Sequence, residues 1–199
     1  MSRHPVRSAT REHIAHLAAR IMAEDGIEDH ALAKRKAARQ AGAPDTRQLP
    51  DNDEIDAALQ TYRDLFQRGH AGEIQALREL ALEIMRGLSG FNPYLTGSVL
   101  TGTAGRFADI QLQLFVDSPK EVEIELLNRG IKFETATARL FAGDMQIDAP
   151  VMSFEHDAVT IRLTLLTPRE LRSRIRASAG GKPVDRADII EVESLLAQE

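Results

Sequence analysis

The amino-acid sequence predicts an α+β fold, in which a helical N-terminal region precedes a mixed β-sheet flanked by helices. Two patterns support this class. Apolar residues recur at helical spacing between residues 10 and 88, whereas apolar and polar residues alternate in short runs after Asn92. With 199 residues, of which 43% are hydrophobic, the chain is long enough to bury a core in one or two compact domains.

Composition limits the classes of function and the cellular location. The chain has no cysteine, which excludes disulfides, thiolate zinc sites and a cysteine nucleophile and fits a reducing compartment. No stretch approaches the roughly 20 apolar residues of a membrane span, and the N-terminus lacks the apolar segment of a signal peptide. We therefore expect a cytoplasmic protein that has no membrane partner.

The first part of the chain predicts helices. Thr10 suits the cap of the first one, and Asp51 with Glu54 resembles a capping box that opens the third. We expect four helices before the first strand, over residues 10–26, 31–41, 53–67 and 73–87.

The rest of the chain predicts a sheet with helices around it. Pro119 suits the first turn of a helix that ends near Arg129. Strands are expected over residues 94–97, 110–114, 131–140, 149–154 and 159–166, and further helices over 169–176 and 186–198. The expected organisation is a helical N-terminal region (1–72), an α/β domain (73–177), and a linker with a C-terminal helix (178–199).

The stretch TGSVLTGTAGRFADIQLQLF carries the candidate site. Gly97 and Ser98 form a turn of small residues, where glycine lets backbone N–H groups approach a phosphate. Thr101 adds a hydroxyl donor, and Gly102 adds a second flexible position. Ten residues separate Ser98 from Asp109, which opens a strand in which apolar and polar residues alternate.

This order of helix, Gly-Ser turn, acid-bearing strand, helix and further strands resembles the nucleotidyltransferase fold of the DNA polymerase beta superfamily, particularly its minimal members. The resemblance covers roughly residues 73–167. It implies one acid after the turn, a second acid two residues later, and a third on a later strand. Asp109 matches the first place, Gln111 occupies the second, and Arg162 lies on the strand where the third is expected.

The missing acids predict a degenerate active site. Nucleotidyl transfer uses a pair of magnesium ions, which require anionic oxygen ligands. The prediction is a protein that is inactive or weakly active in transfer, in which Arg162 binds phosphate in place of a cation. Magnesium is expected only if it arrives with a nucleotide. The residues predicted to bind the nucleotide are Gly97, Ser98, Thr101, Gly102, Gln111 and Arg162.

Two alternatives remain open. In the first, the protein is an active metal-dependent nucleotidyltransferase that uses Asp109 as its catalytic acid, with Asp144 or Asp148 as a further metal ligand. In the second, it is an interaction or scaffold protein without a ligand, which docks a protein partner through its N-terminal helices. One architecture hosts many functions, so the predicted fold does not decide between them.

RNA is a further candidate partner, because basic residues cluster in two places. One cluster is the helix that carries Lys34, Arg35, Lys36 and Arg39, and the other lies within residues 169–176. A solvated helix face explains the first cluster as well. The whole chain also resembles a group of uncharacterised bacterial proteins of similar length, in which a helical N-terminal part precedes the degenerate nucleotidyltransferase segment.

Overall fold

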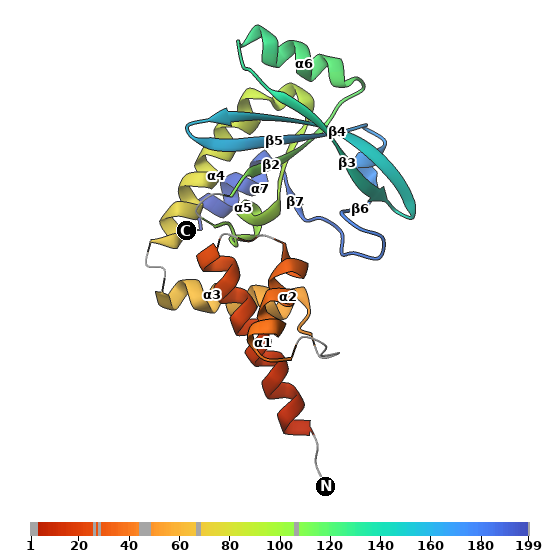
Figure 1. Ribbon diagram of the computed structural model, residues 1–199. Coiled ribbons are helices and arrows are strands. Elements are labelled where there is room, and N and C mark those ends of the chain that lie inside the picture. The colour runs from red at the N-terminus through yellow and green to blue at the C-terminus, as the bar shows by residue number, and fades with distance from the viewer. Residues whose placement is uncertain are drawn as a thin grey trace. The chain divides into compact units, whose positions relative to one another are not determined.

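A computed structural model describes residues 4–25, 27, 29–43, 49–66, 69–105 and 108–198 of the chain. The chain divides into two compact units. The first comprises Met1–Glu73 and Thr103–Ala108, and the second comprises Ile74–Gly102 and Asp109–Glu199. Figure 1 shows helices in the first unit and both helices and a sheet in the second, so the predicted α+β class is confirmed.

The first unit is a helical bundle. Its helices are α1 (His4–Asp25), α2 (His30–Gln40) and α3 (Asn52–Phe66). Their apolar stripes are buried against one another, in a core that contains Ile14, Ala15, Ala18, Ala19, Ile21, Met22, Ala33, Ala37, Ile55, Ala58 and Leu59. Among the described residues of this unit, the exposed large apolar side chains are Leu32 and Leu49, at 37% and 38% exposure.

The predicted capping box at the start of α3 is confirmed. The backbone N–H of Glu54 donates to the Asp51 carboxylate at 2.9 Å, and the N–H of Asp51 donates to the Glu54 carboxylate at 2.7 Å. From α1, Arg11 Nε donates to both oxygens of Glu54 at 2.7 and 2.8 Å. The hydrogen bond from Arg11 is the main reason that the pKa of Glu54 lies below its ordinary value of 4.5.

The second unit contains a mixed sheet and its flanking helices. Its helices are α4 (His70–Gly87, whose first turn belongs to the first unit), α5 (Gly97–Thr101), α6 (Pro119–Asn128) and α7 (Ile189–Leu196), with two 3-10 turns, η1 (Ser89–Phe91) and η2 (Glu170–Arg172). Its strands are β1 (Pro93–Thr96), β2 (Ile110–Phe115), β3 (Glu134–Ala142), β4 (Met145–His156), β5 (Val159–Leu166), β6 (Ile175–Arg176) and β7 (Arg186–Ala187).

The strands form one sheet in the order β6-β3-β4-β5-β2-β1-β7. Strands β2 and β5 are parallel neighbours near the middle, and the other described pairs are antiparallel. Strands β4 and β5 are joined by the two-residue turn Asp157-Ala158, in which both residues have positive φ, as a type I′ hairpin turn requires. This tight turn fixes the register of β4 against β5.

Several segments differ from the sequence prediction. Helix α1 begins at His4, so Thr10 lies inside it and is not its cap. Arg186–Ala187 form β7, and α7 begins only at Ile189, capped by Asp188. Strands β3 and β4 continue to Ala142 and from Met145, so they form one long hairpin around Gly143-Asp144 rather than two shorter strands. The predicted helix over residues 169–176 is wrong beyond the single turn η2, because β6 pairs instead with the end of β3. There the hydrogen bonds of the sheet edge replace those of a helix.

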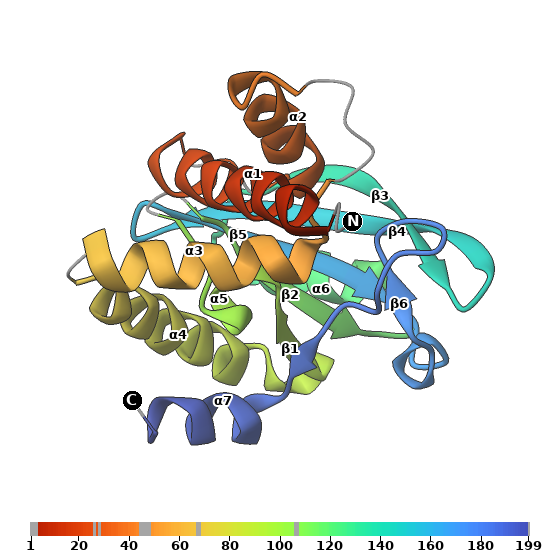
Figure 2. The ribbon, with the colours of Figure 1, turned by 90° about the horizontal axis from the view of Figure 1, so that it is seen from below.

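Helix α6 packs on one face of the sheet, as both views show (Figure 1 and Figure 2). Ser118 caps it, its hydroxyl oxygen accepting from the N–H of Lys120 at 3.4 Å. Val122 and Leu126 are fully buried, whereas the neighbouring Leu127 is 59% exposed.

Among the described residues, no helix reaches the length and apolarity that a bilayer crossing requires.

The two adjacent leucines of α6 test this packing directly. Leu126→Ala empties a fully buried site and is expected to lower the free energy of unfolding by about 2–5 kcal/mol. The matched control Leu127→Ala, on the exposed side of the same turn, is expected to change it by less than about 0.5 kcal/mol. Urea unfolding followed by circular dichroism measures both. Equal losses would show that α6 does not bury the Leu126 side.

The Arg11–Glu54 contact predicts a pH-dependent stability. Because the folded-state pKa of Glu54 is lowered, its contribution is complete above pH 4.5 and is lost as the pH falls through the folded-state pKa. Glu54→Gln is therefore expected to destabilise the protein at neutral pH, and its difference from wild type should shrink in acid. Urea midpoints measured along an acid titration test this. Glu12→Gln, an exposed change on α1, is the control; a Glu54→Gln difference that stays constant with pH contradicts the assignment.

Candidate functional site

The turn between β1 and α5 is built on Gly97. Its φ is +74°, in the left-handed region that favours glycine. A Cβ at this position would lie 3.0 Å from both Cδ and Oε1 of Gln111. Thr96, the residue before the turn, pairs in register with Gln111 on β2, which brings the two segments together. Gly97 is thus required by its backbone conformation and by the Gln111 side chain that covers it.

The far end of the predicted turn is occupied by helix-capping contacts. Gly102 has a φ of +75°, and its N–H donates to the carbonyl oxygen of Ser98. The Thr101 hydroxyl donates to the same carbonyl at 3.4 Å. In this conformation Thr101 and Gly102 therefore terminate α5, and their role in binding a nucleotide stays a prediction. Gly97 and Ser98 lie at the other end of α5, next to β1.

Sequence reasoning missed Arg78, which holds α5 in place. Arg78 lies on α4 and is only 7% exposed. Its Nε donates to the carbonyl oxygen of Val99 at 3.1 Å, and its Nη2 donates to that of Leu100 at 2.7 Å. These are terminal carbonyls of α5 that lack helical partners. The clue in the sequence is that Arg78 lies four residues after Ile74, on the buried side of the helix.

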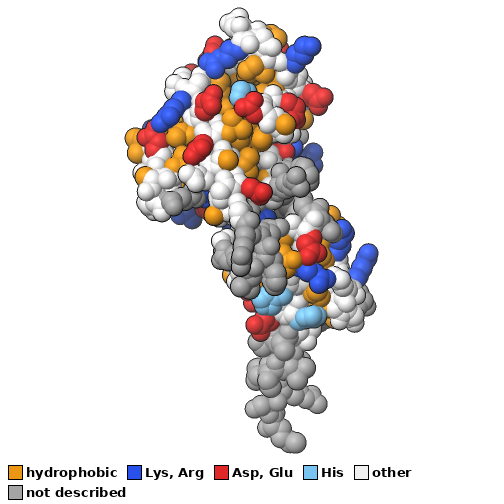
Figure 3. Space-filling model, turned by 90° about the vertical axis from the view of Figure 1, so that its left-hand side faces the viewer, with side chains coloured by type: hydrophobic (Ala, Val, Ile, Leu, Met, Phe, Trp, Pro, Cys, Tyr) orange, Lys and Arg blue, Asp and Glu red, His pale blue; other side chains and the backbone are white. Residues whose placement is uncertain are grey.

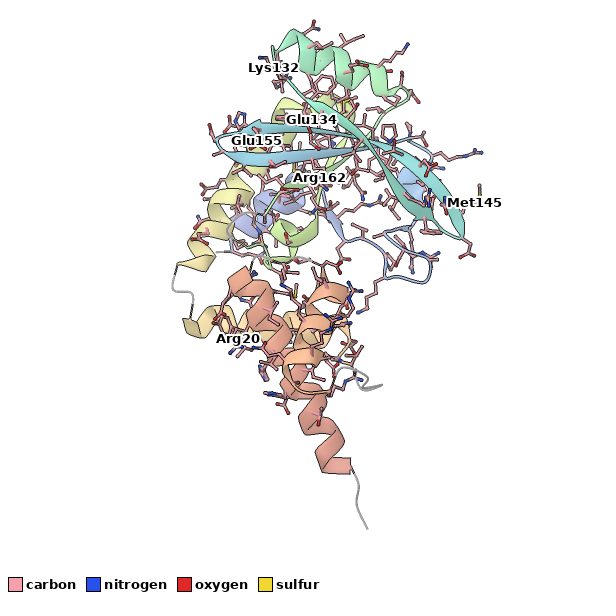
Figure 4. The ribbon with its side chains drawn as sticks, in the orientation of Figure 1. Arg20, Lys132, Glu134, Met145, Glu155 and Arg162 are labelled. Carbon is pink, nitrogen blue, oxygen red and sulfur yellow. The ribbon has the colours of Figure 1, made fainter. Side chains whose placement is uncertain are left out.

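Asp109 and Arg162 form the centre of the site. Asp109 directly precedes β2, and Arg162 lies on β5, the parallel neighbour of β2. Arg162 Nη2 lies 2.7 Å from Asp109 Oδ2, with 49% and 25% of the two side chains exposed. Figure 4 marks Arg162 in the middle strands of the sheet. A guanidinium therefore neutralises Asp109 at the place where the resemblance implies a third acid.

The same face of the sheet carries a polar strip beside this pair. Side chains at paired positions share a face, and the strand register aligns Gln111, Arg162, Ser153 and Glu134 across β2, β5, β4 and β3. In the next row of this face, the Thr160 hydroxyl donates to the Glu155 carboxylate at 2.7 Å. Figure 4 marks Glu134 and Glu155 on these strands.

Gln113 is a second feature that the sequence did not reveal. It lies two residues after Gln111 on β2, on the same face, and is 5% exposed. Within the described part of the chain, its Oε1 accepts no hydrogen bond. A buried acceptor without a donor costs stability, so such a group calls for an explanation, and an incoming donor from a ligand is one.

Asp148, predicted as a metal ligand, is not placed beside Asp109. Ser153 shares a face with Arg162, and Asp148 lies five residues earlier on β4, an odd number that directs it to the opposite face. It also lies about 17 Å away along the strand. On that opposite face its Oδ1 lies 3.7 Å from Nε of Arg139.

The acids of the site do not fit a pair of magnesium ions. Asp144 is fully exposed at the β3–β4 turn, where its Oδ1 lies 3.2 Å from Nη2 of Arg176. Asp109 already faces Arg162, and its neighbour Gln111 is neutral. The described ranges contain no group of three His, Cys, Asp or Glu side chains placed to hold a metal ion. Next to the turn the site thus offers one carboxylate, which is already engaged with Arg162, and Glu134 and Glu155 of the same face do not complete a metal-binding group with it among the described residues.

No protein-family model, curated protein or solved structure matches the chain. Fold and site together define an α+β protein whose mixed sheet carries a polar strip beside an Asp–Arg pair and a glycine turn.

Gly97→Ala tests the geometry of the turn. The left-handed backbone alone is expected to cost about 1–2 kcal/mol of unfolding free energy, and Gln111 must also move. Gly90→Ala, at a position with free space and no positive φ, is the control and is expected to cost less. Urea unfolding of Gly97→Ala, Gln111→Ala and the double variant separates the two effects. If Gln111 covers Gly97, the double variant loses less than the sum of the single variants.

Proposed function

We propose that the second unit is a nucleotidyltransferase-like domain that binds the phosphates of a nucleotide without transferring the nucleotidyl group. The ion pair between Asp109 and Arg162 carries this proposal. Arg162 supplies a positive charge at a place where an active nucleotidyltransferase would need acidic side chains. The Gly97 turn and the polar strip beside Arg162 give the proposed ligand its surroundings.

Magnesium ions and a guanidinium both attract phosphate, but they differ in what they contribute to catalysis. Paired magnesium ions stabilise both the attacking and the leaving oxygen of a phosphoryl transfer. A guanidinium binds phosphate oxygens through a planar fork of N–H donors, but it does not generate an activated nucleophile. Arg162 therefore serves affinity, and the site lacks the ligands that would organise the metal-dependent step.

The exposure of the ion pair makes it exchangeable. Arg162 is about half exposed and Asp109 a quarter exposed, and ion pairs near a surface contribute about 0–1 kcal/mol. A phosphate with more than one negative charge can thus replace Asp109 as the partner of Arg162 at small cost. The buried acceptor of Gln113, on the same face, is suited to a hydroxyl or amino donor of the nucleoside.

Isothermal titration with the four ribonucleoside triphosphates in the presence of EDTA tests the proposal. At least one is expected to bind without magnesium, and Arg162→Gln is expected to weaken this binding at least about tenfold, a difference of 1.4 kcal/mol. Arg139→Gln is the matched control, because Arg139 also pairs with an aspartate but on the opposite face of the sheet. No heat with any nucleotide, or equal losses in both variants, contradicts the proposal.

Asp109→Asn distinguishes this function from the active enzyme. If Asp109 only competes with phosphate for Arg162, its neutralisation is expected to leave nucleotide affinity unchanged or raise it severalfold. If Asp109 is a catalytic metal ligand, the same change abolishes transfer of label from a triphosphate to RNA, protein or a small acceptor. Magnesium-dependent transfer by the wild type that disappears in Asp109→Asn would establish the enzyme instead.

A further inference from the structure

Helix α2 of the first unit carries a stripe of positive charge. Its buried positions are Ala33, Ala37 and Ala38. At 100° per residue, Arg35, Lys36 and Arg39 fall next to one another on the side away from these alanines. Lys34 falls outside this stripe, and its Nζ donates to Asn52 Oδ1 on α3 at 2.6 Å. Arg35, Lys36 and Arg39 thus form a stripe on the outer side of α2.

A groove between α1 and α2 brings a further cation to this stripe. It has a volume of about 540 Å³ and is lined by Arg20, Ile21, Glu24, Lys36, Arg39 and Gln40. Arg20 comes from α1, so its place beside Lys36 and Arg39 follows from helix packing and is not readable from the sequence. Figure 4 marks Arg20 on this unit, and Figure 3 shows Lys and Arg side chains gathered along one edge of it.

The groove is positively charged although the whole chain has a net charge of -5. Among the described residues that line it, three cations face one carboxylate, that of Glu24. This carboxylate accepts a hydrogen bond from the Tyr62 hydroxyl at 2.6 Å and lies 3.9 Å from Arg20 Nε. The groove therefore concentrates positive charge against the overall sign of the protein, which favours an anionic partner.

We propose that this α1–α2 groove binds the phosphate backbone of a nucleic acid without reading its sequence. Lys36 and Arg39 lie on adjacent turns of one helix and Arg20 on the facing helix, so cations line both sides of the groove. None of the described residues that line it is aromatic, so they offer no base stacking of the kind that single-strand binders use. Charge contacts to phosphates are what remains, and these are independent of sequence and sensitive to salt.

Fluorescence anisotropy with a labelled oligo-U RNA strand over a KCl series tests the groove. Three phosphate contacts predict a plot of log affinity against log salt with a slope of about -2. Lys36→Glu/Arg39→Glu is expected to lower affinity at least about tenfold at low salt and to reduce the slope by about 1.4. Circular dichroism checks that this variant is folded; both side chains are exposed.

Two controls make the outcome specific. Lys120→Glu/Arg172→Glu reverses two exposed charges of the second unit, so it changes the net charge equally but is expected to leave RNA binding close to wild type. Competition with poly-glutamate is expected to be much weaker than competition with unlabelled RNA.

Absence of RNA binding, equal effects of the two double variants, or equal competition by poly-glutamate each overturns the proposal. The nucleotide site lies in the other unit, so Arg162→Gln should leave RNA binding unchanged and the two proposals fail separately.

Discussion

The ion pair between Asp109 and Arg162 depends on the parallel register of β2 and β5. In that register Arg162 lies opposite Gln111, two residues beyond Asp109, and its guanidinium reaches the carboxylate at 2.7 Å. A shift of either strand by one residue would turn one of the two side chains to the other face. The tight turn between β4 and β5 and the Gly97 turn before β2 both restrict such a shift.

The same register explains why this site differs from one that holds metal. Asp144 and Asp148, the acids that the sequence suggests as metal ligands together with Asp109, lie elsewhere in the fold. Asp148 faces the other side of the sheet, and Asp144 lies at the tip of the β3–β4 hairpin. The polar strip instead carries charges of both signs, with Arg162 beside Asp109, Glu134 in the same row and Glu155 in the next. Because the Asp109–Arg162 pair is partly exposed, it contributes little stability, and this is why we propose that an anion competes for the arginine.

The sequence predicted those elements whose pattern is local. Strand β5 was located at Val159–Leu166 because period-two alternation and a turn bound it, and the Asp51–Glu54 capping box follows from two residues three apart. Features that depend on partners distant in the chain were not predictable in this way. The side of the sheet on which Asp148 lies depends on the register of β4 against β5. That Arg20 and Lys36 line the same groove depends on how α1 packs on α2.

Arg78 is an intermediate case. Its position on the buried side of α4 is visible in the sequence, but an apolar stripe through Leu77 and Leu80 is equally visible, and the structure leaves those two leucines half-buried. The buried side of α4 places Arg78 where two carbonyl groups of α5 accept its hydrogen bonds. These carbonyl groups lie 21 and 22 residues further along the chain, so the sequence does not show the contact.

We propose that a guanidinium, and not a pair of divalent ions, neutralises the anionic centre of this sheet face. A crystal structure of the protein with magnesium and a non-hydrolysable ribonucleoside triphosphate tests this most directly. We expect phosphate oxygens within hydrogen-bond distance of Arg162 and no metal ion on Asp109. Two magnesium ions coordinated by Asp109 and bridging the triphosphate would contradict it.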